Sequence, residues 1–212
     1  VRLVGSEMCI RDSHNFYASQ MHSFNNIHDR HITEPVGLYS SVMDYTSANI
    51  GPDPKHHGQY YSTVPGPYDI WAIEYGYTPS LENPEDEKDR VKTLLNKSTK
   101  NEYGFGNDAD DMRSPGKGID PRIMVSDMSS DPVGYAQQRM DIIKSLYPNL
   151  LKRYEQPGES YHAFRDAFST LNREYAACTR VISRYIGGVY MDLSLIHISE
   201  PTRRTPISYS VL

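Results

Sequence analysis

The chain of 212 residues is predicted to be mainly α-helical, with long irregular loops between the helices. Residues that favour helix starts and ends bracket several segments in its second half. The longest of these segments, residues 159–186, has apolar side chains three or four residues apart, which gives a helix one apolar face. Stretches rich in Gly, Pro, Ser and Asn separate the segments and favour loops.

The first part of the chain's body, residues 14–65, shows no sustained period and is expected to be irregular. A helix is expected over residues 67–76, because Pro67 suits a first helical turn and Gly76 suits a helix end. A second helix is expected over residues 84–96. Its first turn carries three acidic residues, which the helix dipole favours there: Glu85, Asp86 and Glu87.

Residues 97–130 are predicted to form a second long loop. An Asp-Pro pair then opens an amphipathic helix over residues 132–146, because aspartate caps helices and proline suits their first position. Pro148 is expected to interrupt this helix, since proline removes a helical hydrogen bond, and a shorter segment follows it. The long helix over residues 159–186 is expected to end at Gly187.

The composition is that of an ordinary globular chain, with 38% hydrophobic residues, 23% charged residues and a net charge of −5. It excludes an intrinsically disordered chain. No apolar run approaches the roughly 18 residues that a membrane-spanning helix needs, so no membrane span is predicted. The mild acidity argues against nucleic acid as a partner. Cys178 lies in a helical stretch and is expected to be a buried unpaired thiol.

Two short motifs carry the chemistry. His14-Asn15-Phe16 lies upstream of Ser41-Val42-Met43-Asp44-Tyr45. Together they resemble the second half of a metzincin zinc-peptidase site, in which the third zinc-binding histidine precedes a methionine turn beneath the metal. They are similar to motifs in a large family of bacterial metzincin-like peptidases, written G-L-R-H-N-F and S-V-M-D-Y or S-I-M-D-Y. Weaker similarities to this family follow in order along nearly the whole body.

The resemblance implies the C-terminal part of a metzincin-like (zincin) catalytic domain, from a zinc-dependent metalloendopeptidase that hydrolyses peptide bonds with metal-activated water. By this resemblance His14 is the third Zn²⁺ ligand, and Tyr45 is a catalytic residue that donates a hydrogen bond to the developing oxyanion. The structural Met-turn consists of Ser41, Val42, Met43 and Asp44. The implied substrate is a peptide or protein, and the implied location is the periplasm or the cell exterior.

The first half of the metzincin pattern is missing, since no H-E-x-x-H sequence occurs in the chain. We therefore expect a fragment whose other two ligands and general base lie upstream, and which by itself is inactive and does not hold Zn²⁺ tightly. Residues 1–13 and 193–212 resemble translated adapter sequence on metagenomic reading frames and are excluded from the expected domain, 14–192. Within this domain, 14–65 runs from the third ligand through the Met-turn loop, and 66–192 is helical.

Two other parts of the chain carry potential metal ligands. A second zinc site is conceivable among loop histidines, although such histidines are usually solvated: His22, His28, His31, His56 and His57. The segment 107–111 resembles the start of a calcium loop but lacks the required glycine and distal glutamate, so a solvated or capping acidic turn is the competing interpretation.

The alternative to a peptidase is a non-catalytic helical binding module of an exported bacterial protein. In that case residues 66–190 would form the binding part, and the S-V-M-D-Y sequence would be a coincidence. The genomic sequence upstream of codon 14 separates the two hypotheses. An H-E-x-x-H helix there would favour the enzyme, and its absence would favour the module.

Overall fold

The structure is a computed structural model that describes residues 13–55, 57–111, 118–155, 157–158, 160–191 and 205–206. Its 3-10 helices are η1 (Ala18–Met21), η2 (Lys97–Thr99) and η3 (Asn101–Tyr103). Its α-helices are α2 (Arg30–Val36), α3 (Pro67–Tyr77), α4 (Pro84–Asn96), α5 (Pro132–Tyr154) and α6 (His162–Arg184). Two short strands, β1 (Val189–Tyr190) and β2 (Thr205–Pro206), pair antiparallel. The predicted mainly α-helical fold is confirmed.

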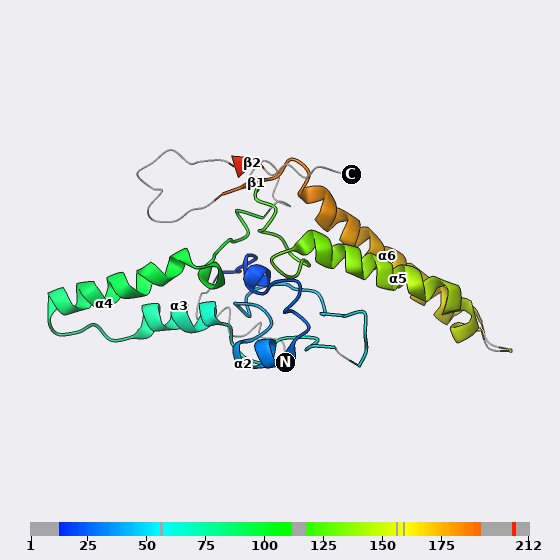
Figure 1. The fold of residues 1–212 in the computed structure, drawn as a ribbon, viewed down its shortest axis with the longest axis horizontal. Coiled ribbons are helices and arrows are strands. Elements are labelled where there is room, and N and C mark those ends of the chain that lie inside the picture. Colours follow the sequence, from blue (N-terminus) through cyan, green and yellow to red (C-terminus); the bar gives the residue numbers. More distant parts are fainter. Residues whose placement is uncertain are drawn as a thin grey trace.

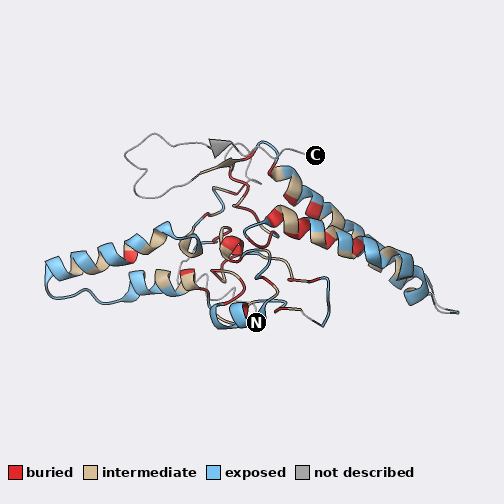
Figure 2. Cartoon of the chain, in the orientation of Figure 1, coloured by how far each residue is buried: buried red, intermediate tan, exposed pale blue. Residues whose placement is uncertain are grey.

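The helices form two hairpins on opposite sides of an irregular centre. In Figure 1, α3 and α4 extend to one side, and α5 and α6 extend to the other. Figure 2 shows that buried residues gather in the irregular segments between the hairpins and in the part of α5 and α6 nearest to them. The core therefore lies where the loops meet, and the hairpins point outward from it.

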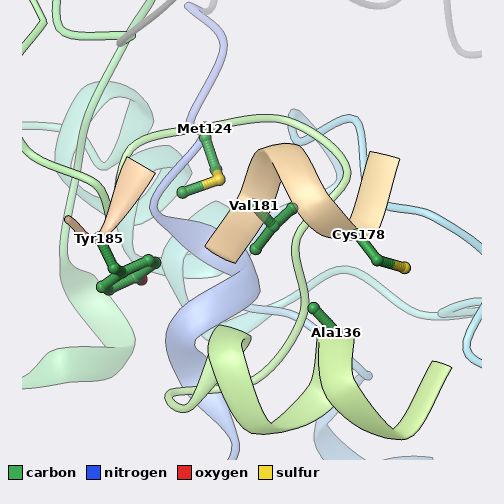
Figure 3. Packing of buried hydrophobic residues seen from close by; sticks show 5 residues of the cluster. All are labelled: Met124, Ala136, Cys178, Val181 and Tyr185. Carbon is green, nitrogen blue, oxygen red and sulfur yellow. The ribbon is translucent and has the colours of Figure 1, made fainter. Parts of the chain in front are cut away.

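One buried cluster joins the inner ends of α5 and α6 to the loop before α5. It contains Met124, Ala136, Cys178, Val181 and Tyr185 (Figure 3). The expected buried, unpaired Cys178 is confirmed. A second cluster joins the segments on either side of α2 to the start of α5. It consists of Ile27, Leu38, Met128 and Tyr135.

The predicted starts of α4 and α5 are confirmed, whereas α6 starts at His162 and not at residue 159. Asn83 caps α4 by accepting a hydrogen bond from Glu85 N at 3.1 Å. Asp131 caps α5 by accepting one from Gly134 N at 2.9 Å. These side-chain acceptors satisfy N–H groups that have no partner within the helix, and for α5 the sequence signal and the observed boundary have the same local cause. Gly187, after α6, adopts a positive φ of 76° that favours glycine.

Three local predictions were wrong. The predicted loop over residues 97–130 begins with two helical turns, η2 and η3. The segment 14–65 is not wholly irregular, because it contains η1 and α2, and Asp29 caps α2 by accepting a hydrogen bond from His31 N at 2.9 Å. Pro148 does not interrupt α5. Next to it, the Tyr147 hydroxyl donates to Asn172 on α6 at 2.9 Å, and packing of this kind holds the helix together despite the hydrogen bond that proline removes.

The predicted tails lie largely outside the described residues, so the domain limits of 14 and 192 stay a prediction. From the C-terminal tail only β2 is described; its Pro206 lies opposite Val189 of β1. No helix in the described parts of the chain is long and apolar enough to cross a membrane.

Candidate functional site

The fold brings the two predicted motifs together. The backbone N–H of Asn15 donates to the carbonyl of Met43 at 3.2 Å, which joins the segment after His14 to the Met-turn. The His14 ring lies 4.9 Å from the Tyr45 ring and 5.2 Å from the Phe16 ring, between centroids. Met43 is buried, whereas Tyr45 is 54% exposed. The imidazole therefore lies beside an exposed phenol and next to a buried methionine turn.

Asp69, near the start of α3, holds the Met-turn in place. Its carboxylate accepts hydrogen bonds from Ser41 Oγ at 2.6 Å, from Val42 N at 3.0 Å and from Gly66 N at 2.9 Å. Ser41 Oγ in turn accepts a bond from Met43 N at 3.1 Å. The Asp69 carboxylate thus fixes both the Met-turn and the first turn of α3.

No role for Asp69 was predicted from the sequence. The available signal was its position three residues after Gly66, at the start of a helix, where an acidic side chain can accept the N-cap N–H. Gly66 itself is required by close packing, because a Cβ at this position would overlap the carbonyl of Ser40. What the sequence could not show is that this carboxylate also reaches back to the Met-turn.

Asn15, the second residue of the H-N-F motif, binds a distant loop to the site. It is fully buried; its side-chain amide donates to Gly104 O at 3.0 Å, and its Oδ1 accepts from Gly106 N at 3.2 Å. Phe16 N donates to Gly106 O at 2.7 Å. These bonds fix the loop of residues 104–106 against the segment that carries His14.

The acidic turn after this loop contacts His14 directly. Asp108 Oδ2 lies 2.7 Å from His14 Nδ1. Asp110 Oδ2 accepts from Asn107 N at 3.2 Å, and Asn107 Oδ1 accepts from Ala109 N at 2.8 Å, so the turn is capped by its own side chains. The turn has the capping bonds that one interpretation of the sequence predicted, and its contact with His14 was not anticipated.

Two buried carboxyl groups lie near each other, and one of them, Asp44, belongs to the Met-turn itself. Asp44 Oδ2 accepts from Ser19 N at 3.0 Å, and Asp127 accepts from Ser19 Oγ at 2.9 Å and from Gln20 Nε2 at 2.8 Å. Burial raises the pKa of Asp44 from 3.8 to about 8. Burial, and the nearby Asp44 charge, also raise the pKa of Asp127 well above 3.8. At neutral pH this pair therefore resists full ionisation.

The other loop histidines that the structure describes have contacts of their own. His22 Nε2 is 2.8 Å from Gly37 O, and His28 lies beside His57 with ring centroids 5.8 Å apart. Burial lowers the pKa of His28, and the neighbouring His57 lowers it further. His31 lies on α2, and His56 is outside the described residues. Among the residues that the structure describes, no three His, Cys, Asp or Glu side chains are grouped so that they could hold a metal ion.

Comparison with known proteins gives one match. The model of a family described as Met-zincin matches residues 13–209, a span that contains the H-N-F segment, the Met-turn, both hairpins and β2. Searches of curated proteins and of solved structures found no match. Because the family model covers most of the sequence, the chain belongs to the Met-zincin family, a family of the metzincin type.

Proposed function

We propose that this chain supplies the third zinc ligand, the Met-turn and an oxyanion-binding tyrosine of a zinc-dependent metalloendopeptidase. The observation that carries the proposal is the position of His14 beside the Met-turn, with Asn15 N bonded to Met43 O at 3.2 Å and the Tyr45 ring 4.9 Å from the imidazole. Membership of the Met-zincin family supports a zinc peptidase as the parent protein.

The geometry at His14 suits a zinc ligand. Its Nδ1 is engaged by Asp108 at 2.7 Å, which leaves Nε2 as the nitrogen that can bind a metal. The His14 side chain is one-quarter exposed, so a metal and a substrate can both reach it. Neutral imidazole is a good ligand for Zn²⁺, which acts as a Lewis acid and lowers the pKa of water when it is bound.

Tyr45 is the residue of this chain that we place next to the reacting carbonyl. Its backbone is fixed, because Tyr45 O accepts a hydrogen bond from Ser126 N at 2.9 Å. Its side chain is more than half exposed beside His14. A phenol in this position can donate a hydrogen bond to the oxyanion that develops when a peptide carbonyl is attacked.

The other two ligands and the general base would come from a segment outside these 212 residues, because no H-E-x-x-H sequence is present. The chain by itself is then inactive, since one histidine does not bind zinc tightly and no glutamate of that motif is present to activate water. Retention of stoichiometric zinc through dialysis, or chelator-sensitive hydrolysis of casein by this chain alone, would refute this part of the proposal.

The decisive experiment uses the parent enzyme, reconstructed with the upstream segment. We expect His14→Ala to abolish both zinc retention and peptide hydrolysis, because it removes a ligand. Tyr45→Phe keeps the aromatic ring and removes the donor, so zinc should stay bound while kcat falls roughly ten- to a thousandfold. Tyr77→Phe is the matched control, because Tyr77 is also exposed and lies at the end of α3. Full activity of Tyr45→Phe would remove the tyrosine from the mechanism.

The family match does not favour a non-catalytic binding module, and the genomic sequence upstream of codon 14 provides an independent check. We propose a peptide or protein as the substrate and, from the resemblance, an exported parent enzyme.

A further inference from the structure

We propose that Asp108 is a positioning residue that holds His14 in a single tautomer and presents its Nε2 nitrogen for zinc; the proposal rests on the function proposed above. Asp108 Oδ2 lies 2.7 Å from His14 Nδ1, within hydrogen-bonding distance. An ionised carboxylate can only accept a hydrogen bond. Nδ1 must therefore carry the proton, and in neutral His14 the lone pair is on Nε2.

The contact is partly exposed, with side-chain exposures of 25% for His14 and 66% for Asp108. Exposed ion pairs on flexible side chains contribute little, because holding two mobile groups together costs entropy. The importance of this pair therefore depends on whether the backbone fixes Asp108 in place.

The backbone on the Asp108 side is fixed by residues of the H-N-F motif. Gly106 N donates to Asn15 Oδ1 at 3.2 Å, and Gly106 O accepts from Phe16 N at 2.7 Å. Gly106 is two residues from Asp108 and lies next to the turn that carries it. The segment that contains His14 therefore also anchors the loop that leads to Asp108.

The turn itself is closed from both ends. Asn107 O accepts from Asp110 N at 3.0 Å and from Asp111 N at 3.1 Å, and Asp110 Oδ2 accepts from Asn107 N at 3.2 Å. In this turn Asp108 is directed to His14, whereas Asp110 closes the turn. On the other side, the Phe16 and Tyr45 rings limit the rotation of the imidazole. Both partners are therefore held before a metal arrives.

A carboxylate that accepts the second ring N–H of a ligand histidine fixes the orientation of the ring and increases its basicity. Loss of such a partner typically reduces metal affinity about ten- to a hundredfold. Asp108 would act through His14 and would not touch the substrate, so its effect must appear in the tautomer and in metal affinity.

The test is ¹⁵N NMR of histidine-labelled chain, at a pH where His14 is neutral. We expect the wild-type spectrum to show a protonated Nδ1 and an unprotonated Nε2. Asp108→Ala should move the proton partly or wholly to Nε2, because its acceptor is gone. Asp110→Asn is the matched control, since it removes the same charge from the same turn and keeps an acceptor for Asn107 N. The proposal is overturned if Asp108→Ala leaves the tautomer unchanged, or if Asp110→Asn changes it equally.

Titration of the same samples and of the reconstructed parent with zinc sulfate separates this proposal from the proposed function. Because the chain alone does not hold zinc tightly, the affinities are compared in the reconstructed parent, where we expect zinc to shift the Nε2 resonance of His14 and to require about ten- to a hundredfold more metal in Asp108→Ala. Equal zinc affinity in both forms of the parent would overturn the positioning role. A third outcome is that Asp108 controls the tautomer but zinc shifts no His14 resonance, either in these chains or in the reconstructed parent. In that case His14 is not a zinc ligand, and Asp108 does not position one.

Discussion

Replacement of Asp69 by alanine should destabilise the chain more than replacement of any ordinary surface aspartate. The carboxylate accepts three hydrogen bonds, from Ser41 Oγ, Val42 N and Gly66 N, at 2.6, 3.0 and 2.9 Å. A hydrogen bond to a charged group contributes roughly 1.5–3 kcal/mol, but partial exposure lets water replace some of it. We therefore expect a loss of about 3 kcal/mol in the free energy of unfolding, equivalent to roughly 6–12 °C in Tm for a chain of this size.

The assay is thermal and urea unfolding followed by circular dichroism, with Asp86→Ala as the matched control. Asp86 is exposed and also lies in the first turn of a helix, where its interaction with the helix dipole contributes about 0.3–1 kcal/mol. Hydrogen exchange supplies a local readout. The amides of Val42 and Gly66 should lose protection in Asp69→Ala, because their acceptor has been removed.

The expected result is a large loss of stability in Asp69→Ala, a small loss in Asp86→Ala, and rapid exchange at Val42 only in the first variant. If the two variants unfold within about 0.5 kcal/mol of each other and the Val42 amide stays protected, Asp69 does not hold the Met-turn.

Two other predictions concern the surroundings of the Met-turn. Gly66→Ala should destabilise the chain, because the added Cβ would overlap the Ser40 carbonyl. Gly76→Ala, at a helical position with open space around it, should stabilise the chain by about 0.5–1 kcal/mol. Equal effects of the two substitutions on the free energy of urea unfolding would contradict the packing argument. The pKa of Asp44 is about 8 in the folded chain and 3.8 in the reference state, so the folded state binds more protons between these values. The contribution of Asp44 to the free energy of unfolding is therefore fully present below about pH 4 and is lost as the pH rises toward 8. Asp44→Asn should reduce the decrease in the free energy of unfolding between pH 5 and pH 7.5, whereas the control Asp86→Asn should not. If this pH dependence is unchanged in Asp44→Asn, Asp44 is not buried in its protonated form.

Local features of the fold could be predicted from the sequence because their causes are local. The start of α4 was predicted from Pro84 and the acidic residues of its first turn, and the start of α5 from the pair Asp131-Pro132. The continuity of α5 through Pro148 could not be predicted in this way, because it depends on the packing of α5 along α6 (Figure 1).

The same distinction applies to the candidate site. The motifs indicated His14 and the Met-turn, but the three carboxylates around them come from other parts of the chain. Asp69 contacts the Met-turn from α3, and Asp108 contacts His14 from a capped turn. Asp127, in the loop before α5, interacts with Asp44 of the Met-turn and accepts a hydrogen bond from Ser19. Nothing in the periodicity of the sequence connects these segments, since their contacts depend on how the loops pack.

The central claim is that His14 binds zinc above the Met-turn, and anomalous diffraction at the zinc absorption edge tests it most directly. The crystals would contain the parent enzyme, with the upstream segment restored. The claim predicts one strong anomalous peak at about 2.1 Å from His14 Nε2, on the side of the ring opposite Asp108. A fully occupied zinc site elsewhere in the protein, with His14 bound to no metal, would contradict it.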